Sequence, residues 1–302
     1  MDTMPTCWIE PGPCWGHDML ATAVVLSAVL SAVVAIAVTL VIERWGGRIG
    51  GVLGTIPTTI VPAGIGLALA SDAEALAASL AVVPYGMLIN GCFLLVYVLV
   101  PPRLSSTGGG ALMLTTTTAL LVWGAFGAVV LLTLEPLLLR MEAMTLALVG
   151  TVGLAAMGII VARGPRPAPA GHRSPGSAEI MARGLAAATA IGLAVYLSGL
   201  GLPLLAGLSS VFPAIFLTTM VGLWLSQGPD VPLGAAGPML LGSTSVAVYA
   251  CLAMWSLPVL GVWWGSAVAW GLSIAVWTLP CSWWVMRSDS APAPTMPAQA
   301  PQ

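Results

Sequence analysis

The sequence predicts an all-α, polytopic membrane protein of about nine transmembrane helices, and three observations support this prediction. Hydrophobic residues make up 58% of the 302 residues and charged residues only 7%, too few to cover a soluble globule of this size. Apolar segments recur at roughly twenty residues, the helical length that crosses a hydrocarbon core of about 30 Å. The sequence lacks the alternating segments of roughly ten residues that build a transmembrane β-barrel.

The nine predicted spans are separated by short polar or glycine-rich links. They cover residues 19–42, 49–70, 73–100, 111–134, 143–162, 179–200, 202–226, 231–257 and 258–286. We divide the chain into an outer tail (1–18), a first transmembrane repeat with a linking helix (19–162), a cytoplasmic linker rich in proline and arginine (163–178), a second repeat (179–286) and a disordered cytoplasmic tail (287–302).

An internal repeat predicts how the spans are arranged. With Pro57 aligned to Pro213, a shift of 156 residues, five of twenty positions are identical, against roughly two expected by chance in so apolar a chain. Spans one to four and six to nine then form two copies. Because five crossings precede the second copy, it enters the membrane in the opposite orientation. The result is a 4+1+4 inverted repeat, an arrangement typical of alternating-access transporters.

The arginines predict the orientation, because Lys and Arg near span ends accumulate on the cytoplasmic side. The chain has no lysine. With the N-terminus outside, eight of the nine arginines lie on the inner side and only Arg140 lies outside. We therefore expect an outer N-terminus and a cytoplasmic C-terminus.

Prolines in the second span of each copy mark the predicted functional region. Pro57 and Pro62 fall inside residues 49–70, and Pro213 falls inside residues 202–226. Each proline removes a backbone donor and leaves carbonyls that must find other partners. Two interpretations stay open: a kinked packing helix whose hydroxyls bond to their own backbone, or a locally opened helix that lines a solute site. Pro57 and Pro213 lie about two turns in from opposite faces, so we expect them to converge near the membrane centre.

Asn90 is the most polar side chain at membrane depth in the first half, and Thr244 is its counterpart in the second. An amide without partners in hydrocarbon costs several kcal/mol, so Asn90 must be hydrogen-bonded. Its partner is either another helix, which would hold the bundle together, or a passing solute.

These features predict a secondary transporter or facilitator of a small neutral or weakly polar solute. The alternative is a non-transporting membrane component that supports a cell-envelope pathway. We expect no His, Asp or Glu at membrane depth, which argues against an intramembrane enzyme and against proton coupling through a carboxylate. The candidate solute-binding residues are Thr55, Pro57, Thr58, Thr59, Asn90, Ser209, Ser210, Pro213, Thr218, Thr219, Ser243 and Thr244.

The remaining polar and thiol groups give weaker signals. His17 and His172 have no second ligand nearby in the sequence, so we expect no metal, no cofactor and no nucleic-acid partner; the expected partners are the lipid bilayer and a small solute. Three cysteines lie in spans and are expected to act as small apolar residues. Cys7 and Cys14 lie in the outer tail, where an oxidising compartment makes a local disulfide a candidate.

Two stretches resemble a known family. Residues 207–219 (GLSSVFPAIFLTT) and 51–59 (GVLGTIPTT) are similar to the GlpM-like family of small four-helix bacterial inner-membrane proteins, which carry a Gly and Phe-Pro pattern early in their second helix. Ile56 stands where that family has phenylalanine, and the resemblance covers about thirty residues in each half. It implies a fused duplicate located in a bacterial inner membrane, and it leaves the activity open.

Overall fold

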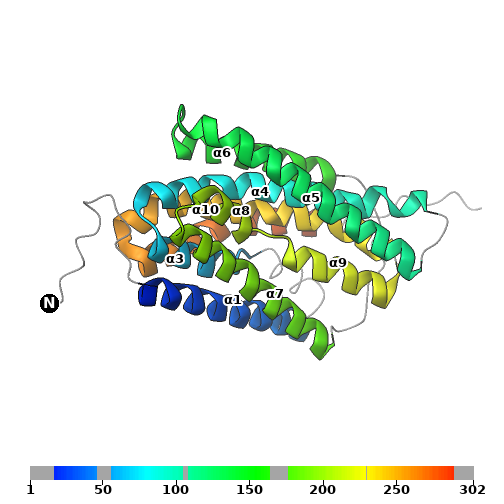
Figure 1. Cartoon of the computed structure of the whole chain (residues 1–302). Helices are drawn as coiled ribbons and strands as arrows, with labels where there is room; N and C mark the ends of the chain where they lie inside the picture. The colour runs from blue at the N-terminus through cyan, green and yellow to red at the C-terminus, as the bar shows by residue number, and fades with distance from the viewer. Residues whose placement is uncertain (1–16, 46–55, 105–107, 164–175, 229, 289–302) are drawn as a thin grey trace, which may run out of the picture.

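The computed structural model describes residues 17–45, 56–104, 108–163, 176–228 and 230–288. All regular structure within these residues is helical, which confirms the all-α prediction. Seven helical segments are long and apolar enough to cross a membrane. The helices run roughly side by side in one elongated bundle (Figure 1).

The helices follow one another through short connections. Their bounds are α1 (His17–Trp45), α3 (Ile60–Ala70), α4 (Ala73–Leu99), η1 (Pro101–Arg103), α5 (Gly109–Leu138), α6 (Ala143–Ala162), α7 (Ser177–Gly199), α8 (Pro203–Ser210), α9 (Ala214–Gln227), α10 (Asp230–Ser273), the π-helical η2 (Ile274–Thr278) and α11 (Leu279–Ser288).

Helix α4 lies at the centre of the bundle. In its apolar segment 72% of the residues are buried, against 17% in α5. It packs against α5, α6, α8 and α10, and its Phe93 and Tyr97 are completely buried. The side chains that α4 contributes to the candidate site are therefore surrounded by protein.

Helix α10 is a hairpin rather than one long rod. Gly261 has φ 77° and ψ 167°, a conformation that favours glycine, and the chain reverses there. The Ser256 hydroxyl donates to the Gly265 carbonyl over 2.9 Å, so the two arms touch beside the turn. Farther along, the Trp277 indole donates to the Leu241 carbonyl over 3.0 Å. The turn lies a few residues later than the boundary expected at residues 257–258.

Helix pairs from the two halves of the chain pack directly on one another. Helix α1 lies along α7, and α4 lies along the first arm of α10, while α6 contacts both α4 and α10. Small residues allow the close α1–α7 approach: a Cβ at Gly184 would lie 2.8 Å from the Ile36 side chain. Small residues at helix contacts are typical of membrane proteins.

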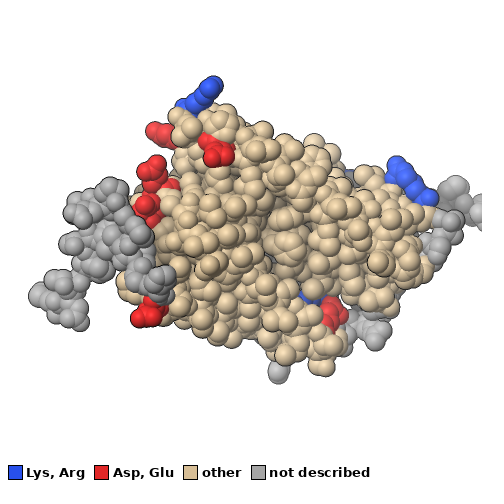
Figure 2. Space-filling view, in the orientation of Figure 1, with Lys and Arg blue, Asp and Glu red and all other residues tan. Residues whose placement is uncertain are grey.

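The outer faces of the bundle are apolar. Large aliphatic side chains point outward, with Leu132 73% exposed, Leu185 71% and Val152 69%. Contiguous apolar surface of this kind is rare on soluble proteins. Figure 2 shows most of the charged side chains near the two ends of the bundle, with a broad uncharged band between them. This distribution is that of a membrane protein.

Candidate functional site

The helical segment 203–227 is interrupted beside Pro213. Helix α8 ends at Ser210 and α9 begins at Ala214, with Pro213 as its N-cap. Across the break, the Phe212 N–H donates to the Ser209 carbonyl over 3.1 Å in a turn-like bond. The helix is thus interrupted at Pro213 rather than continuous through it.

In the first copy, the structure corrects the expected position of Pro57. It lies before α3, in a non-helical stretch where the Thr58 N–H donates to the Ile56 carbonyl over 2.8 Å, and not inside a helix. Pro62 lies in the first turn of α3, where a missing N–H removes no intrahelical bond. Two prolines five residues apart thus allow a helix only from Ile60 onward. Thr55 lies outside the described residues.

Helix α3 begins at Ile60, directly after the non-helical residues 56–59. Helix α3 ends, and α8 begins, at the same end of the bundle (Figure 1). Helix α3 is 11 residues long and α8 is 8 residues long. At 1.5 Å per residue these helices are about 16 Å and 12 Å long.

Asn90 connects α4 to the break. Its side-chain amide donates to the Val211 carbonyl over 2.8 Å and lies 3.4 Å from the Met87 sulfur. Its side-chain oxygen accepts a 2.8 Å hydrogen bond from the Trp123 indole. Asn90 is only 2% exposed, so these protein groups satisfy its polar atoms. The structure therefore supplies the interhelical partner that the sequence required.

Trp123 and Phe212 complete this cluster. Their rings meet edge to face with centroids 5.2 Å apart, so an aromatic side chain of α5 covers the break in the α8–α9 segment. Sequence reasoning missed Trp123, because a tryptophan inside a span gives no signal beyond its apolar bulk. Its indole N–H in a predominantly apolar span was the available clue, since a buried indole needs an acceptor.

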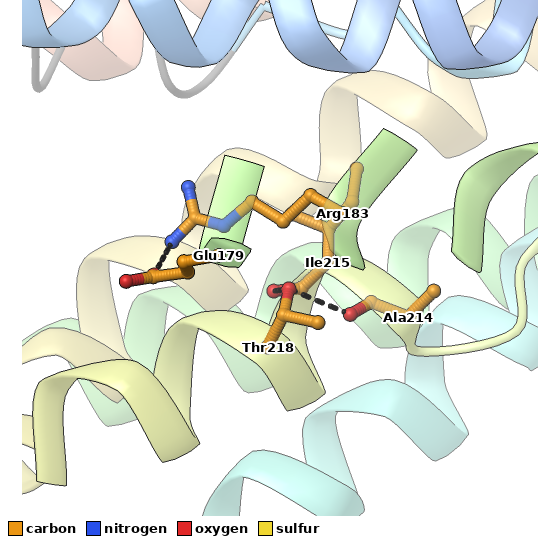
Figure 3. Close-up of polar contacts among 5 residues, drawn as sticks. All are labelled: Glu179, Arg183, Ala214, Ile215 and Thr218. Atoms are coloured by element: carbon orange, nitrogen blue, oxygen red, sulfur yellow. Dashed lines mark hydrogen bonds and ion pairs between the residues drawn. The ribbon is translucent and has the colours of Figure 1, made fainter. Parts of the chain in front are cut away.

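Three of the eight described hydroxyl candidates bond to their own helices. The Ser210 hydroxyl donates to the Gly207 carbonyl over 2.7 Å, and that of Ser243 to Leu240 over 2.6 Å. Thr218 donates to the carbonyls of Ala214 and Ile215 over 2.9 and 3.1 Å (Figure 3). Four further candidates are half-buried: Thr58, Thr59, Ser209 and Thr219. Thr244 differs, because it is fully buried and its hydroxyl has no partner in the described part of the chain.

Other buried hydroxyls gather around α3. A Cβ at Gly64 would lie 2.6 Å from the Tyr249 hydroxyl, and one at Gly66 would overlap the Ser27 hydroxyl. Both hydroxyls are buried; the Tyr249 hydroxyl lies beside that of Ser266, whereas the Ser27 hydroxyl has no hydrogen-bond partner within the described ranges. Buried polar groups normally have a partner in protein or water. The sequence did not single out these residues, because isolated Ser and Tyr in apolar spans look like packing residues.

One ion pair joins two residues of α7 on the side that faces α9. The Arg183 guanidinium donates to the Glu179 carboxylate over 2.7 Å, with 15% and 27% of the two side chains exposed. Both residues belong to the candidate span Ser177–Gly199. Glu179 is the third residue of α7, at the start of this span. The sequence assigned it to a span boundary, and only the packing of α9 against α7 shows that it is covered.

The cysteines and other potential ligands add no second centre. Cys92, Cys251 and Cys281 are free thiols. Cys7 and Cys14 lie outside the described residues. In the ranges that the structure covers, no three His, Cys, Asp or Glu residues are grouped closely enough to hold a metal ion.

The geometry thus brings Asn90, Trp123 and the α8–α9 break together, and places buried hydroxyls around α3. No protein-family model, curated protein or solved structure matches the chain.

Proposed function

We propose that the protein is a secondary transporter or facilitator of a small neutral or weakly polar solute, with its site at mid-membrane beside the two helix breaks. The observation that carries this proposal is the interruption between α8 and α9, with the freed Val211 carbonyl held by Asn90. Discontinuous helices whose breaks lie near the membrane centre are typical of the binding sites of transporters.

Nine crossings are part of this proposal. The apolar stretch Ala236–Trp284 has 49 residues, roughly twice the length that one crossing needs, and it reverses at Gly261. It supplies two crossings. Helix α3, with its 11 residues, is too short to cross alone, and we count it together with the residues before it.

An inverted repeat is supported by which helices pack together. In the proposed scheme α1 corresponds to α7, and α4 to the first arm of α10. Each of these helices packs on its own counterpart. A two-fold axis in the membrane plane would produce such contacts for the helices that lie beside the axis. The counterparts run in opposite directions along the bundle (Figure 1). This arrangement is that of two halves able to rock about a shared centre.

The solute class is inferred from the polar groups near the breaks. Apart from Asn90, the candidate residues offer hydroxyls and backbone carbonyls, and elsewhere in the described bundle the buried hydroxyls of Ser27 and Thr244 have no partner. Such groups can exchange hydrogen bonds with a neutral solute or coordinate a weakly hydrated ion. They offer no charge to bind a strongly ionic solute at mid-depth.

For the membrane and the orientation, we propose the bacterial inner membrane with the N-terminus outside. The acidic side chains Asp72, Glu74 and Glu142 lie at helix starts on the end where α1 begins, whereas Arg103 follows α4 at the opposite end. This distribution agrees with a cytoplasmic excess of arginine.

The test is uptake by the full-length protein in reconstituted vesicles, with a panel of labelled polyols, sugars and amides. Pro213→Ala should abolish uptake of the active solute while thermal stability stays near that of the parent. The matched control is Pro136→Ala, an exposed proline inside α5. If no member of the panel is transported, or if both variants transport like the parent, the transporter proposal fails.

A second function is favoured by a specific observation. The polar atoms of Asn90, Ser210, Thr218 and Ser243 are occupied by protein groups, which suits a static membrane component that supports a cell-envelope pathway. This alternative predicts that no solute shifts the melting temperature and that a protein partner co-purifies in mild detergent.

A further inference from the structure

Helix α7 carries two opposite charges on the side that faces α9, at a distance from the breaks. Figure 3 shows Glu179 and Arg183 on α7, above Thr218 of α9. The guanidinium is only 15% exposed although it belongs to a candidate membrane span. Ionisable side chains within spans are costly to keep there and usually mark functional sites.

The contacts of Arg183 leave much of its binding capacity unused. A guanidinium has five N–H donors in a rigid planar fork. In the described part of the chain, Arg183 makes one hydrogen bond, from Nη2 to a single oxygen of Glu179, and its Nε is buried without an acceptor. A buried donor without a partner is unfavourable, more so on a charged group. The guanidinium of Arg183 therefore has at least one buried N–H donor without an oxygen acceptor.

The packing of α9 against α7 places a glycine where the Glu179 carboxylate lies. The Glu179 carboxylate rests on Gly222, where a Cβ would lie 2.5 Å from Oε1. Any larger residue at this position would displace the carboxylate. The pair itself is spaced i to i+4 on one helix, and such pairs contribute only about 0.3–0.5 kcal/mol to helix stability. Stabilisation of α7 alone does not account for a covered guanidinium.

We propose that Arg183 binds an oxyanion, a carboxylate or a phosphate, between α7 and α9, and that Glu179 is the internal anion it releases on binding. Both oxyanion classes match the guanidinium fork with two parallel hydrogen bonds. The anion comes either from the aqueous phase or from the headgroup of an anionic lipid. Anion binding here uses charges that the proposed solute site does not need, so it can exist whether or not the protein transports a solute.

The experiment measures the melting temperature of the full-length protein in non-ionic detergent. Inorganic phosphate is titrated at constant ionic strength in one arm, and phosphatidylglycerol is added to the micelles in the other. The parent should be stabilised in at least one arm, since a ligand that binds the folded state raises its stability. Arg183→Gln should weaken the apparent affinity by about tenfold or more, the effect of losing one charged hydrogen bond. Arg140→Gln, at an exposed arginine, is the matched control and should behave like the parent.

Glu179→Gln distinguishes an anion site from a structural ion pair. If Glu179 competes for the fork, its neutralisation should tighten anion binding; a purely structural pair would only lose stability. Arg183→Lys keeps the positive charge but lacks the planar guanidinium donors, so it should weaken anion binding several-fold. This variant replaces Arg183→Gln in the test if Arg183→Gln does not fold.

A shift with phosphate alone identifies a soluble anion, and a shift with phosphatidylglycerol alone identifies a lipid headgroup. The proposal is overturned if neither arm stabilises the parent, if Arg183→Gln and Arg140→Gln respond alike, or if Glu179→Gln leaves the affinity unchanged or lower. Uptake of neutral solutes plays no part in this readout, so failure here does not bear on the transporter proposal.

Discussion

The side-chain amide of Asn90 donates a 2.8 Å hydrogen bond to the main-chain carbonyl of Val211, the residue that follows the end of α8. A helix break inside a membrane leaves carbonyls that water cannot reach, and an amide from a neighbouring helix satisfies one of them. The same amide accepts from the Trp123 indole. One side chain thus joins α4, α5 and the break.

We expect Asn90→Leu to destabilise the protein through this network. The substitution leaves the Val211 carbonyl and the Trp123 indole without partners, which costs about 1–3 kcal/mol when groups are fully buried, although hydrogen bonds measured in membrane proteins average only about 0.6 kcal/mol. A double-mutant cycle with Trp123→Phe, measured by unfolding in mixed micelles, should give a positive coupling. Strict additivity of the two changes would contradict the described network.

Gly66→Ala should be destabilising, because the added methyl group would overlap the Ser27 hydroxyl and the Val195 side chain. Overpacking of this kind costs about 1–3 kcal/mol. Gly124→Ala in α5 is the control, since a Cβ there meets nothing within 4 Å, and alanine is a better helix former by up to about 1 kcal/mol. Melting temperatures of the two variants should therefore move in opposite directions. Equal shifts would show that the α1–α3–α7 contact is not closely packed.

Topology can be checked with reporter fusions. A reporter placed between residues 163 and 178, or after residue 288, should be active only in the cytoplasm, because arginines near span ends favour that side. A fusion after Leu139, in the turn between α5 and α6, should report the outer face. If reporters at residue 170 and after Leu139 give the same location, α6 does not cross the membrane. The second repeat would then not be inverted relative to the first.

The tail cysteines give a further test. Cys7 and Cys14 should resist alkylation until a reductant is added, because a thiol pair in an oxidising compartment forms a disulfide. Cys92, which is free and half-buried, serves as an internal thiol that does not depend on reductant. Alkylation of both tail cysteines in protein isolated without reductant would refute this disulfide.

Several features of the fold could be read from the sequence because they depend on composition and local chemistry. Apolar runs of helical length require membrane helices, since a bilayer offers no water to the backbone. Pro213 was expected to kink or break its helix, because a proline in a helix interior lacks an N–H and its ring clashes with the preceding turn. Asn90 needed a partner for the same reason that any buried amide does.

The tertiary structure decided which groups meet. Asn90 bonds to Val211, rather than to Thr244 or a solute, because α8 crosses α4. The two helices can approach closely because Gly207 of α8 has no Cβ where it meets the Ser79 backbone of α4. That Glu179 lies covered on Gly222 depends on α9 packing against α7. These are contacts between residues far apart in the chain. Local propensity and periodicity specify helices and their apolar faces, but in a bundle with almost uniformly apolar surfaces they do not specify which faces pair; close packing of small residues does.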